Sequence, residues 1–268
     1  MNRLDETYFD LNCPLDLALL ADFHNSDPVP VLESLKNNKP DIITIAGDFV
    51  FGDRPRTGRL KIEENPNAVE LLSGCSRIAP TFISPGNHEY TLIKADLKVI
   101  RRTGVTFLDN QWTEYKNTVI GGLSSAFFTA YKAFRANCPS KELYPKPDNT
   151  VRSRSIPPDM AWLDGFEQQP GYHILLCHHP EYYPKYLKNR KIDLILSGHC
   201  HGGQWQFYSP IHHRMRGVYA PGQGLFPELT SGVYDNRLVV SRGLANTTFV
   251  PRFNNPTEII YIRKSSGK

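Results

Sequence analysis

The sequence has no long hydrophobic run, no CxxC cysteine pair and no strong excess of charge of either sign. Its longest unbroken apolar stretch, Leu17 to Ala21, is far shorter than the ~20 residues of a membrane-spanning helix. The first residues include Asp5 and Glu6 and lack the apolar centre of a signal peptide. Five irregularly spaced cysteines exclude a disulfide scaffold and favour a reducing, cytoplasmic setting.

The charge is modest, and charges of both signs are interleaved along the chain. The formal net charge of the 268 residues is +4, which by itself gives no reason to expect nucleic-acid binding. Hydrophobic residues make up 40% of the chain, enough to bury a sizeable core.

Five short apolar runs recur along the chain, and each ends abruptly in polar or glycine residues. They span residues 15–21, 41–46, 80–84, 172–177 and 192–196. Their length and their Ile, Leu and Val content predict buried strands. Apolar residues at helical spacing predict helices over 29–37, 68–77 and 92–102. Alternating strands and helices are typical of a parallel sheet, in which ligands bind at the carboxyl ends of the strands.

Each of the five runs is followed by candidate metal ligands. They are Asp22, His24, Asp48, Asn87, His178, His199 and His201. A mixed set of oxygen and nitrogen donors suits Mn, Fe or Zn better than Mg or Ca. Seven ligands are too many for one tetrahedral ion but suit two ions that share a bridging carboxylate. Such a pair can stabilise the attacking and leaving oxygens of a displacement at phosphorus.

The motifs around these residues resemble those of a known superfamily. They are D-x-H at 22–24, G-D at 47–48, G-N-H-E at 86–89, H-x-P at 178–180 and G-H-x-H at 198–201. In this order, over residues 15–204, they resemble the calcineurin-like metallophosphoesterase superfamily. The tail, at 198–204, 222–234 and 236–259, is similar to the bacterial phosphodiesterase subgroup that includes hydrolases of the UDP-diacylglucosamine pyrophosphatase type.

The resemblance implies an α/β fold, a four-layer αββα sandwich of two packed mixed sheets. It implies a single domain over residues 1–268, with its core at 15–204. Residues 205–268 are then expected to complete the second sheet and the rim of the active site.

The same resemblance implies a role for each candidate ligand. The first metal ion would be bound by Asp22, His24 and His201. The second would be bound by Asn87, His178 and His199, with Asp48 bridging the two. The nucleophile would be a metal-bridging hydroxide, and His88 would protonate the leaving oxygen or stabilise the phosphoryl charge.

One position departs from the family pattern. Relatives often carry G-D-x-x-D, whose second Asp orients the catalytic His, but this chain has Phe51 there. Either Asp53 replaces the missing carboxylate, or His88 acts mainly by hydrogen bonding. The second alternative suits substrates whose leaving group needs little protonation.

Four residues are candidates for substrate binding. Arg54 lies in a polar loop that is either solvated or a clamp for phosphate oxygens. His179 adjoins a ligand and is a candidate for the pocket wall. Trp205 and Phe226 belong to an aromatic segment that either packs under a loop or forms a rim for an acyl chain, a base or a membrane surface.

The sequence thus predicts a binuclear metal hydrolase that cleaves a phosphodiester or pyrophosphate bond in a small or lipid-linked phosphoester. A nuclease and a non-catalytic scaffold of the same fold are the alternatives, and the modest charge argues against nucleic acid. The expected location is cytoplasmic, with at most peripheral contact with the inner membrane face and no obligate protein partner.

Overall fold

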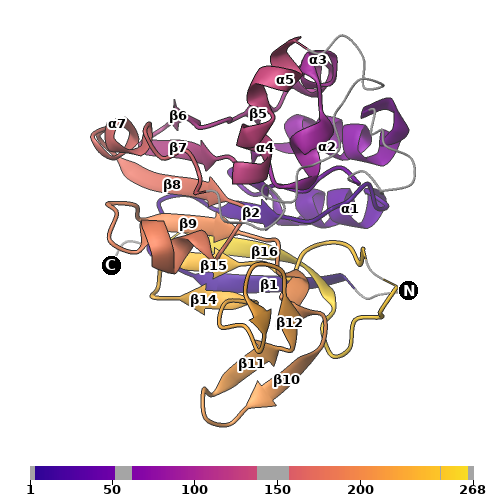
Figure 1. The fold of residues 1–268 in the computed structure, drawn as a ribbon, viewed down its shortest axis with the longest axis vertical. Coiled ribbons are helices and arrows are strands. Elements are labelled where there is room, and N and C mark those ends of the chain that lie inside the picture. Colours follow the sequence, from indigo (N-terminus) through magenta and orange to yellow (C-terminus); the bar gives the residue numbers. More distant parts are fainter. Residues whose placement is uncertain (1–3, 52–61, 138–156, 248, 265–268) are drawn as a thin grey trace.

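A computed structural model describes residues 4–51, 62–137, 157–247 and 249–264 of the chain (Figure 1). Two six-stranded sheets dominate it. In spatial order, the first sheet contains β1 (Leu4–Asp10), β16 (Thr257–Arg263), β2 (Leu17–Leu20), β3 (Ile42–Ala46), β4 (Thr81–Ser84) and β5 (Thr106–Phe107). The second contains β14 (Gly232–Tyr234), β15 (Leu238–Val240), β9 (Leu194–Ser197), β8 (Tyr172–Cys177), β7 (Thr118–Leu123) and β6 (Gln111–Tyr115).

Helices cover the outer faces of these sheets. The longer ones are α1 (Val29–Asn38), α2 (Pro66–Ile78) and α3 (Lys94–Arg102). Shorter elements are α4 (Ala126–Ala130), α5 (Lys132–Asn137), α7 (Leu163–Glu167), η1 (Ile62–Glu64), η2 (His88–Thr91), η4 (Tyr183–Leu187) and η5 (His201–Gly203). Two small hairpins, β10 (Gln206–Ser209) with β11 (Arg214–Gly217) and β12 (Tyr219–Ala220) with β13 (Gly224–Leu225), project beside the second sheet (Figure 1). Among the described residues, no helix has the length and apolar composition needed to cross a bilayer.

The alternation of side chains along the strands builds the layers. In β2, Leu17 and Leu19 pack between the two sheets, whereas Ala18 and Leu20 belong to the core beneath α1 and α2. On the opposite face of the second sheet, Phe166 of α7 packs into a third cluster. Successive side chains of a strand point to opposite faces, so a strand covered on both sides must be apolar throughout. The result is the expected four-layer arrangement.

All five predicted strands and all three predicted helices are present, but the strands are divided between two sheets. β2, β3 and β4 are parallel neighbours in the first sheet, and β8 and β9 are parallel neighbours in the second. The alternating pattern alone predicted one parallel sheet, whereas the family resemblance predicted two. The second sheet begins with the β6–β7 hairpin, which the sequence analysis did not identify.

The C-terminal tail, which was expected to complete the second sheet, contributes to both sheets. β14 and β15 do extend the second sheet. β16, however, lies in the first sheet between β1 and β2. Ile260 and Ile262 of β16 face the layer between the sheets and Tyr261 faces the helices, so this strand needs an apolar layer on both sides.

Candidate metal centre

The seven predicted ligands and His88 come together where strands of both sheets end. Asp22 and His24 follow β2, Asp48 follows β3, and Asn87 and His88 follow β4. From the second sheet, His178 follows β8, while His199 and His201 follow β9. Three groups of these side chains lie close enough to hold a metal ion: Asp22, His24 and His201; His24, Asp48 and His88; and Asp48, His178 and His199.

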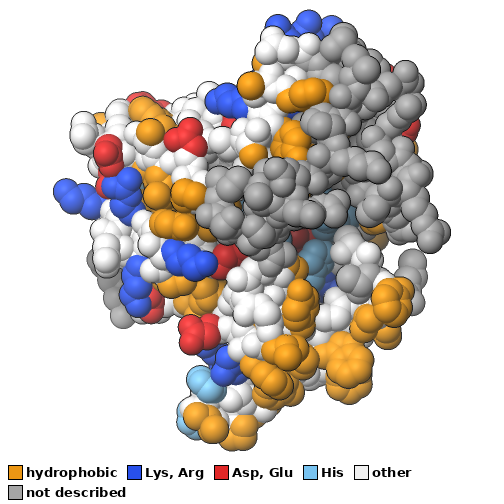
Figure 2. Space-filling model, viewed as in Figure 1, with side chains coloured by type: hydrophobic (Ala, Val, Ile, Leu, Met, Phe, Trp, Pro, Cys, Tyr) orange, Lys and Arg blue, Asp and Glu red, His pale blue; other side chains and the backbone are white. Residues whose placement is uncertain are grey.

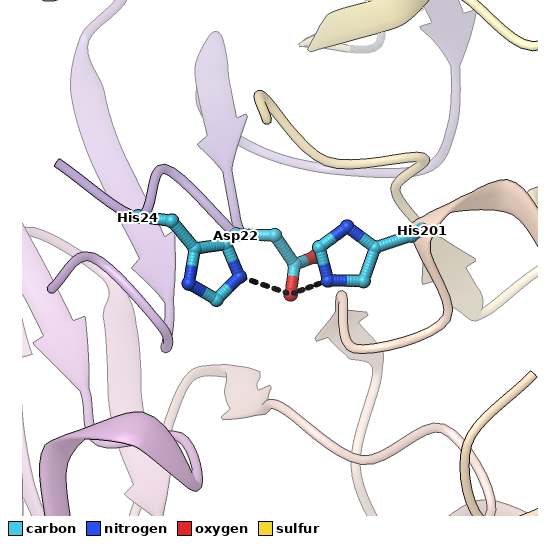
Figure 3. Close-up of side chains that lie close together, drawn as sticks. All are labelled: Asp22, His24 and His201. Carbon is cyan, nitrogen blue, oxygen red and sulfur yellow. Dashed lines mark ion pairs between the residues drawn. The ribbon is translucent and has the colours of Figure 1, made fainter. Parts of the chain in front are cut away.

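The first group combines residues from the two sheets. Asp22 Oδ1 lies 3.5 Å from His201 Nε2 and 3.9 Å from His24 Nε2 (Figure 3). In the close-up, both imidazoles point toward the same carboxylate oxygen, His24 from one side and His201 from the other. This is the set that the resemblance assigns to the first metal ion.

Asp48 lies between histidines of the two predicted ligand sets. Its Oδ2 atom is 3.1 Å from His178 Nε2 and 3.9 Å from His24 Nε2. The same carboxylate therefore reaches a histidine of each predicted ligand set, as a bridging ligand must. Its other oxygen, Oδ1, accepts a hydrogen bond of 2.8 Å from the His88 amide, which fixes the orientation of the carboxylate.

The loops that carry the ligands have unusual backbone conformations. Five of the ligands have positive φ angles of 46–68°: Asp22, His24, Asp48, His199 and His201. Such angles are uncommon for residues other than glycine and concentrate at functional sites, where the surrounding structure compensates for the strain. Here the compensation includes hydrogen bonds between loops, from the Asp22 amide to Gly47 O and from the His199 amide to both carboxylate oxygens of Asp22.

Hydrogen bonds fix the ring orientation of two ligand histidines. His178 Nδ1 lies 2.6 Å from the carbonyl oxygen of Ala46, so Nδ1 is the donor and Nε2 faces Asp48. His201 Nδ1 lies 3.2 Å from Ala245 O, and its Nε2 faces Asp22. A backbone carbonyl that holds the far nitrogen of a ligand imidazole is a common feature of metal sites.

Burial and neighbouring charges also determine the protonation of these groups. Burial, together with nearby His88, holds the pKa of His24 well below its usual value, which favours the neutral imidazole that binds metals. Burial alone would lower the pKa of His178, but adjacent Asp48 outweighs it and raises that pKa to about 10. Burial would raise the pKa of Asp48, but His178 and His88 hold it well below the usual range. Metal binding by His178 would displace its Nε2 proton.

The donors present fit transition-metal ions. His24 Nε2 and Asn87 Oδ1 are buried, and neither has a hydrogen-bond partner in the described part of the chain. Buried polar atoms are costly unless they are paired or coordinated. Cations bound by the two predicted ligand sets would satisfy these atoms, and imidazole and carboxylate donors suit Mn, Fe or Zn.

Glu89 holds two of the ligand loops together and was not identified from the sequence. Its buried carboxylate accepts hydrogen bonds from the amides of Asp48, Gly86 and Val50. Burial and then the charge of Asp48 raise the pKa of Glu89 to about 8. The G-N-H-E motif could have indicated this role. An acidic residue directly after a loop is a natural acceptor for backbone amides of the loop that lack another partner.

His88 lies at the edge of the centre, where it meets the solvent. Its side chain is 31% exposed, its Nε2 lies 3.8 Å from Asp48 Oδ2, and its ring packs edge-on against His24. Phe51, at the position where relatives often have an acid, lies edge-on to His24 with ring centroids 6.3 Å apart. Asp53, the suggested replacement, lies outside the described residues.

A cavity of about 550 Å³ opens beside the centre. Its polar end includes Asp48, Asn87, His88, His199 and His201, and its other walls are largely apolar. The apolar walls include Trp205, Val218, Tyr219, Pro221, Phe249 and Val250. A ligand that fills this cavity would therefore place a polar group at the cluster and an apolar group against the aromatic walls.

The four predicted substrate-binding residues have different locations. Trp205 lies in the wall of the main cavity. Phe226 lines a separate cavity of about 250 Å³, together with Glu181 and Glu228. His179 is buried behind His178 and His199, with ring centroids 5.1 and 4.2 Å from theirs. Arg54 lies outside the described residues.

Buried Asp, Asn and His side chains at the carboxyl ends of strands in two packed sheets define a metal-binding α/β protein. The model of one family, the calcineurin-like phosphoesterases, matches residues 15–203. The chain belongs to this family, as its motifs predicted.

Several curated proteins are similar to the chain over most of its length. A metallophosphoesterase of Helicobacter pylori is 26% identical and covers 97% of this chain, which spans 63% of that protein's length. The UDP-2,3-diacylglucosamine pyrophosphatase LpxG of Chlamydia muridarum is 25% identical, with 93% of this chain and 83% of that protein aligned. The phosphodiesterase YaeI of Escherichia coli is 27% identical, with 73% and 63% aligned. The similarities to LpxG and YaeI match the bacterial subgroup that the tail resembles.

Proposed function

We propose that the chain is a binuclear metal-dependent phosphohydrolase that cleaves a phosphodiester or pyrophosphate bond. The observation that carries this proposal is the convergence of the ligand groups on Asp48, which contacts histidines of both predicted sets. When bound, two Mn, Fe or Zn ions would supply a hydroxide nucleophile and positive charge for the phosphoryl oxygens.

In this proposal the chain's own residues position the substrate and transfer the proton. The exposed face of His88 lies in the cavity wall, beside Asp48, where it can donate a proton or hydrogen bond to the leaving oxygen. The backbone amide of His88 holds the Asp48 carboxylate in place. The same residue therefore orients the carboxylate with its backbone and supplies the proposed acid with its side chain. Asn87, whose side-chain oxygen is buried and unpaired among the described residues, would contribute that oxygen to the second ion.

The shape of the cavity favours substrates with an apolar substituent, including lipid-linked phosphoesters. The walls beyond the polar end contain Trp205, Tyr219 and Phe249, whose exposed fractions are 48, 51 and 99%. The similarity to LpxG, named as a pyrophosphatase of a diacylated sugar nucleotide, supports the same substrate class. A nuclease would need a basic groove, and no Lys or Arg is among the described residues that line this cavity.

We further propose that the protein is cytoplasmic and contacts membranes only peripherally. Figure 2 shows hydrophobic side chains gathered at the lower end of the molecule, over the β10–β11 hairpin. The exposed residues there include Phe207, Tyr208 and Ile211, and β11 carries Arg214 and Arg216. Aromatic side chains with nearby arginines suit the headgroup region of an anionic membrane.

The metal-loaded chain can be tested with elemental analysis and a panel of substrates. The panel contains a phosphomonoester, a phosphodiester, a nucleotide-sugar pyrophosphate and single-stranded DNA. We expect two ions per chain and the fastest hydrolysis of the diester or the pyrophosphate. Asp48→Asn should reduce both the metal content and the rate, whereas Asp164→Asn, at a surface carboxylate, serves as the control.

The binuclear phosphohydrolase, the nuclease and the non-catalytic scaffold predict different results in this experiment. One ion or none per chain would contradict the binuclear site. Preference for DNA with a steep salt dependence would favour a nuclease. Two ions without hydrolysis of any substrate would favour a non-catalytic scaffold.

Membrane contact needs a separate experiment, co-sedimentation with vesicles of phosphatidylcholine and phosphatidylglycerol. We expect salt-sensitive binding that Ile211→Ser weakens. Val29→Ser is the matched control, because Val29 is 50% exposed on α1. Equal binding by both variants, or none by the unmodified chain, would contradict the proposed surface.

A further inference from the structure

Three buried polar side chains, Ser125, His179 and Glu181, form a connected series. The series lies behind His178 and His199, two of the predicted ligands of the second ion. We propose that Glu181 is a positioning residue, which orients the imidazole of His199 for the second metal ion. This inference rests on the proposed function, because it assigns Glu181 a role at the same metal centre. The family motif ends at Pro180, one residue before Glu181.

The series is continuous and shielded from solvent. Glu181 Oε1 lies 3.2 Å from His179 Nδ1 and 3.8 Å from His199 Nε2. At the other side of its ring, His179 Nε2 lies 2.8 Å from Ser125 Oγ. His199, His179 and Glu181 are only 5–7% exposed, and Ser125 is 1% exposed. Electrostatic interactions at such sites are weakly screened.

One assignment of donors and acceptors satisfies every hydrogen bond of the series. An ionised carboxylate only accepts, so His179 Nδ1 donates to Glu181. His179 Nε2 is then the acceptor for the Ser125 hydroxyl, whose oxygen also accepts the Phe127 amide at the start of α4. The backbone of α4 thereby fixes Ser125, Ser125 fixes His179, and His179 fixes the carboxylate.

This arrangement restricts the possible roles of His179. The group His179, Glu181 and His199 is close enough to suggest a metal site of its own. However, both ring nitrogens of His179 already have hydrogen-bond partners. His179 is therefore a support for Glu181 and not a ligand.

The packing around Glu181 holds its carboxylate close to His199. The rings of His179 and His199 are in contact, with centroids 4.2 Å apart. On another side, Gly222 leaves room for the carboxylate, because a Cβ atom at that position would overlap Glu181. A carboxylate held near Nε2 of an imidazole favours the tautomer with its proton there. Nδ1 of His199 then keeps its lone pair for a metal ion.

The test is a titration of the metal-free full-length chain with Co²⁺, followed by visible absorption, with elemental analysis of the ions retained. Glu181→Gln preserves the shape of the side chain but removes its charge. We expect its affinity for the second ion to fall about 10–100-fold, with the first ion bound as before. Glu228→Gln is the matched control, because Glu228 is an exposed carboxylate that lines the same small cavity as Glu181.

Thermal unfolding of the metal-free variants distinguishes positioning from a general structural role. We expect equal unfolding temperatures for Glu181→Gln and the unmodified chain, and a changed Co²⁺ spectrum for the second ion only. Unchanged binding in Glu181→Gln would overturn the inference while leaving the proposed function intact. Equal weakening of both ions, with a lower unfolding temperature, would also overturn it. An unmodified chain that binds fewer than two ions would overturn the proposed function as well.

Discussion

Some side chains at the centre hold in place the loops that carry the predicted ligands. The carboxylate of Glu89 accepts amide hydrogen bonds from the loops after β3 and β4, and it is fully buried. The loops place Asp48 and Asn87 in the wall of the same cavity, although the two residues follow different strands. A ligand set of this kind therefore depends on residues that contact no metal.

Replacing Glu89 by Ala should destabilise the metal-free protein. The change leaves the amides of Asp48, Gly86 and Val50 without their acceptor, and each unsatisfied buried group costs about 1–3 kcal/mol. We expect a loss of several kcal/mol in the free energy of unfolding by urea. Glu33→Ala, at an exposed position of α1, should change it by less than about 0.5 kcal/mol. Similar values for the two variants would refute this role of Glu89.

The contribution of His88 should depend on the leaving group. General acid catalysis typically contributes about 10²–10⁴-fold, and a good leaving group needs little of it. His88→Ala should therefore slow hydrolysis of an alkyl phosphodiester much more than that of a nitrophenyl diester. Phe51 stands where relatives often have an orienting acid. If His88 acts mainly by hydrogen bonding without such an acid, Asp53→Asn should have little effect. A loss with Asp53→Asn as large as with His88→Ala would instead identify Asp53 as the orienting partner.

At the scale of elements, the strand-to-loop junctions determine where the ligands lie. Gly47, between β3 and Asp48, has φ +80°. A Cβ atom there would lie 2.6 Å from Gly86 N and 2.8 Å from His178 Nδ1. The loops after β3, β4 and β8 thus approach too closely for any side chain at position 47. The glycine of the G-D motif is required by this close approach.

Gly47→Ala should destabilise the fold and reduce metal binding. The left-handed backbone costs a non-glycine residue about 1–2 kcal/mol, and overlap in a packed region adds about 1–3 kcal/mol. Gly224→Ala is a matched control, because Gly224 has φ +81° with nothing within 4 Å of a Cβ atom. We expect Gly224→Ala to lose only the stability that the left-handed backbone conformation costs, and to retain its metal. Equal destabilisation and equal metal content would show that crowding at Gly47 is unimportant.

At the scale of the whole molecule, the centre connects the two sheets. Asp22, His24 and Asp48 come from the first sheet, whereas His178, His199 and His201 come from the second. The sheets also share the apolar layer that contains Leu19 and Leu196. A metal ion bound here would add a direct connection between loops that are far apart in the sequence.

Metal ions should therefore raise the global stability of the protein. A ligand at 100 times its dissociation constant adds about 2.7 kcal/mol per site to the free energy of unfolding. We expect the unfolding temperature to increase with Mn²⁺ or Zn²⁺ and to fall after treatment with a chelator. The Asp48→Asn variant should lose most of this difference, because its carboxylate contacts histidines of both sets. An unfolding temperature independent of metal would contradict this expectation.

The sequence by itself determined the local elements and predicted the candidate ligands. Short apolar runs with abrupt polar ends predicted β2, β3, β4, β8 and β9 within a few residues, because these strands are apolar on both faces. The ordered motifs after them identified the family and predicted the seven candidate ligands. The sequence could not show which strands share a sheet, because hydrophobic periodicity carries no information about pairing partners.

Only the tertiary structure decided the position of β16 and the contacts of Glu89 and Glu181. β16 pairs with β1 and β2 in the first sheet, although both strands are far from it in the sequence. Glu89 accepts hydrogen bonds from amides up to 41 residues away. Glu181 contacts His179, whose other ring nitrogen contacts Ser125, 56 residues before Glu181. These contacts exist because the two sheets pack face to face and bring their loops to one end, which no local pattern of residues specifies.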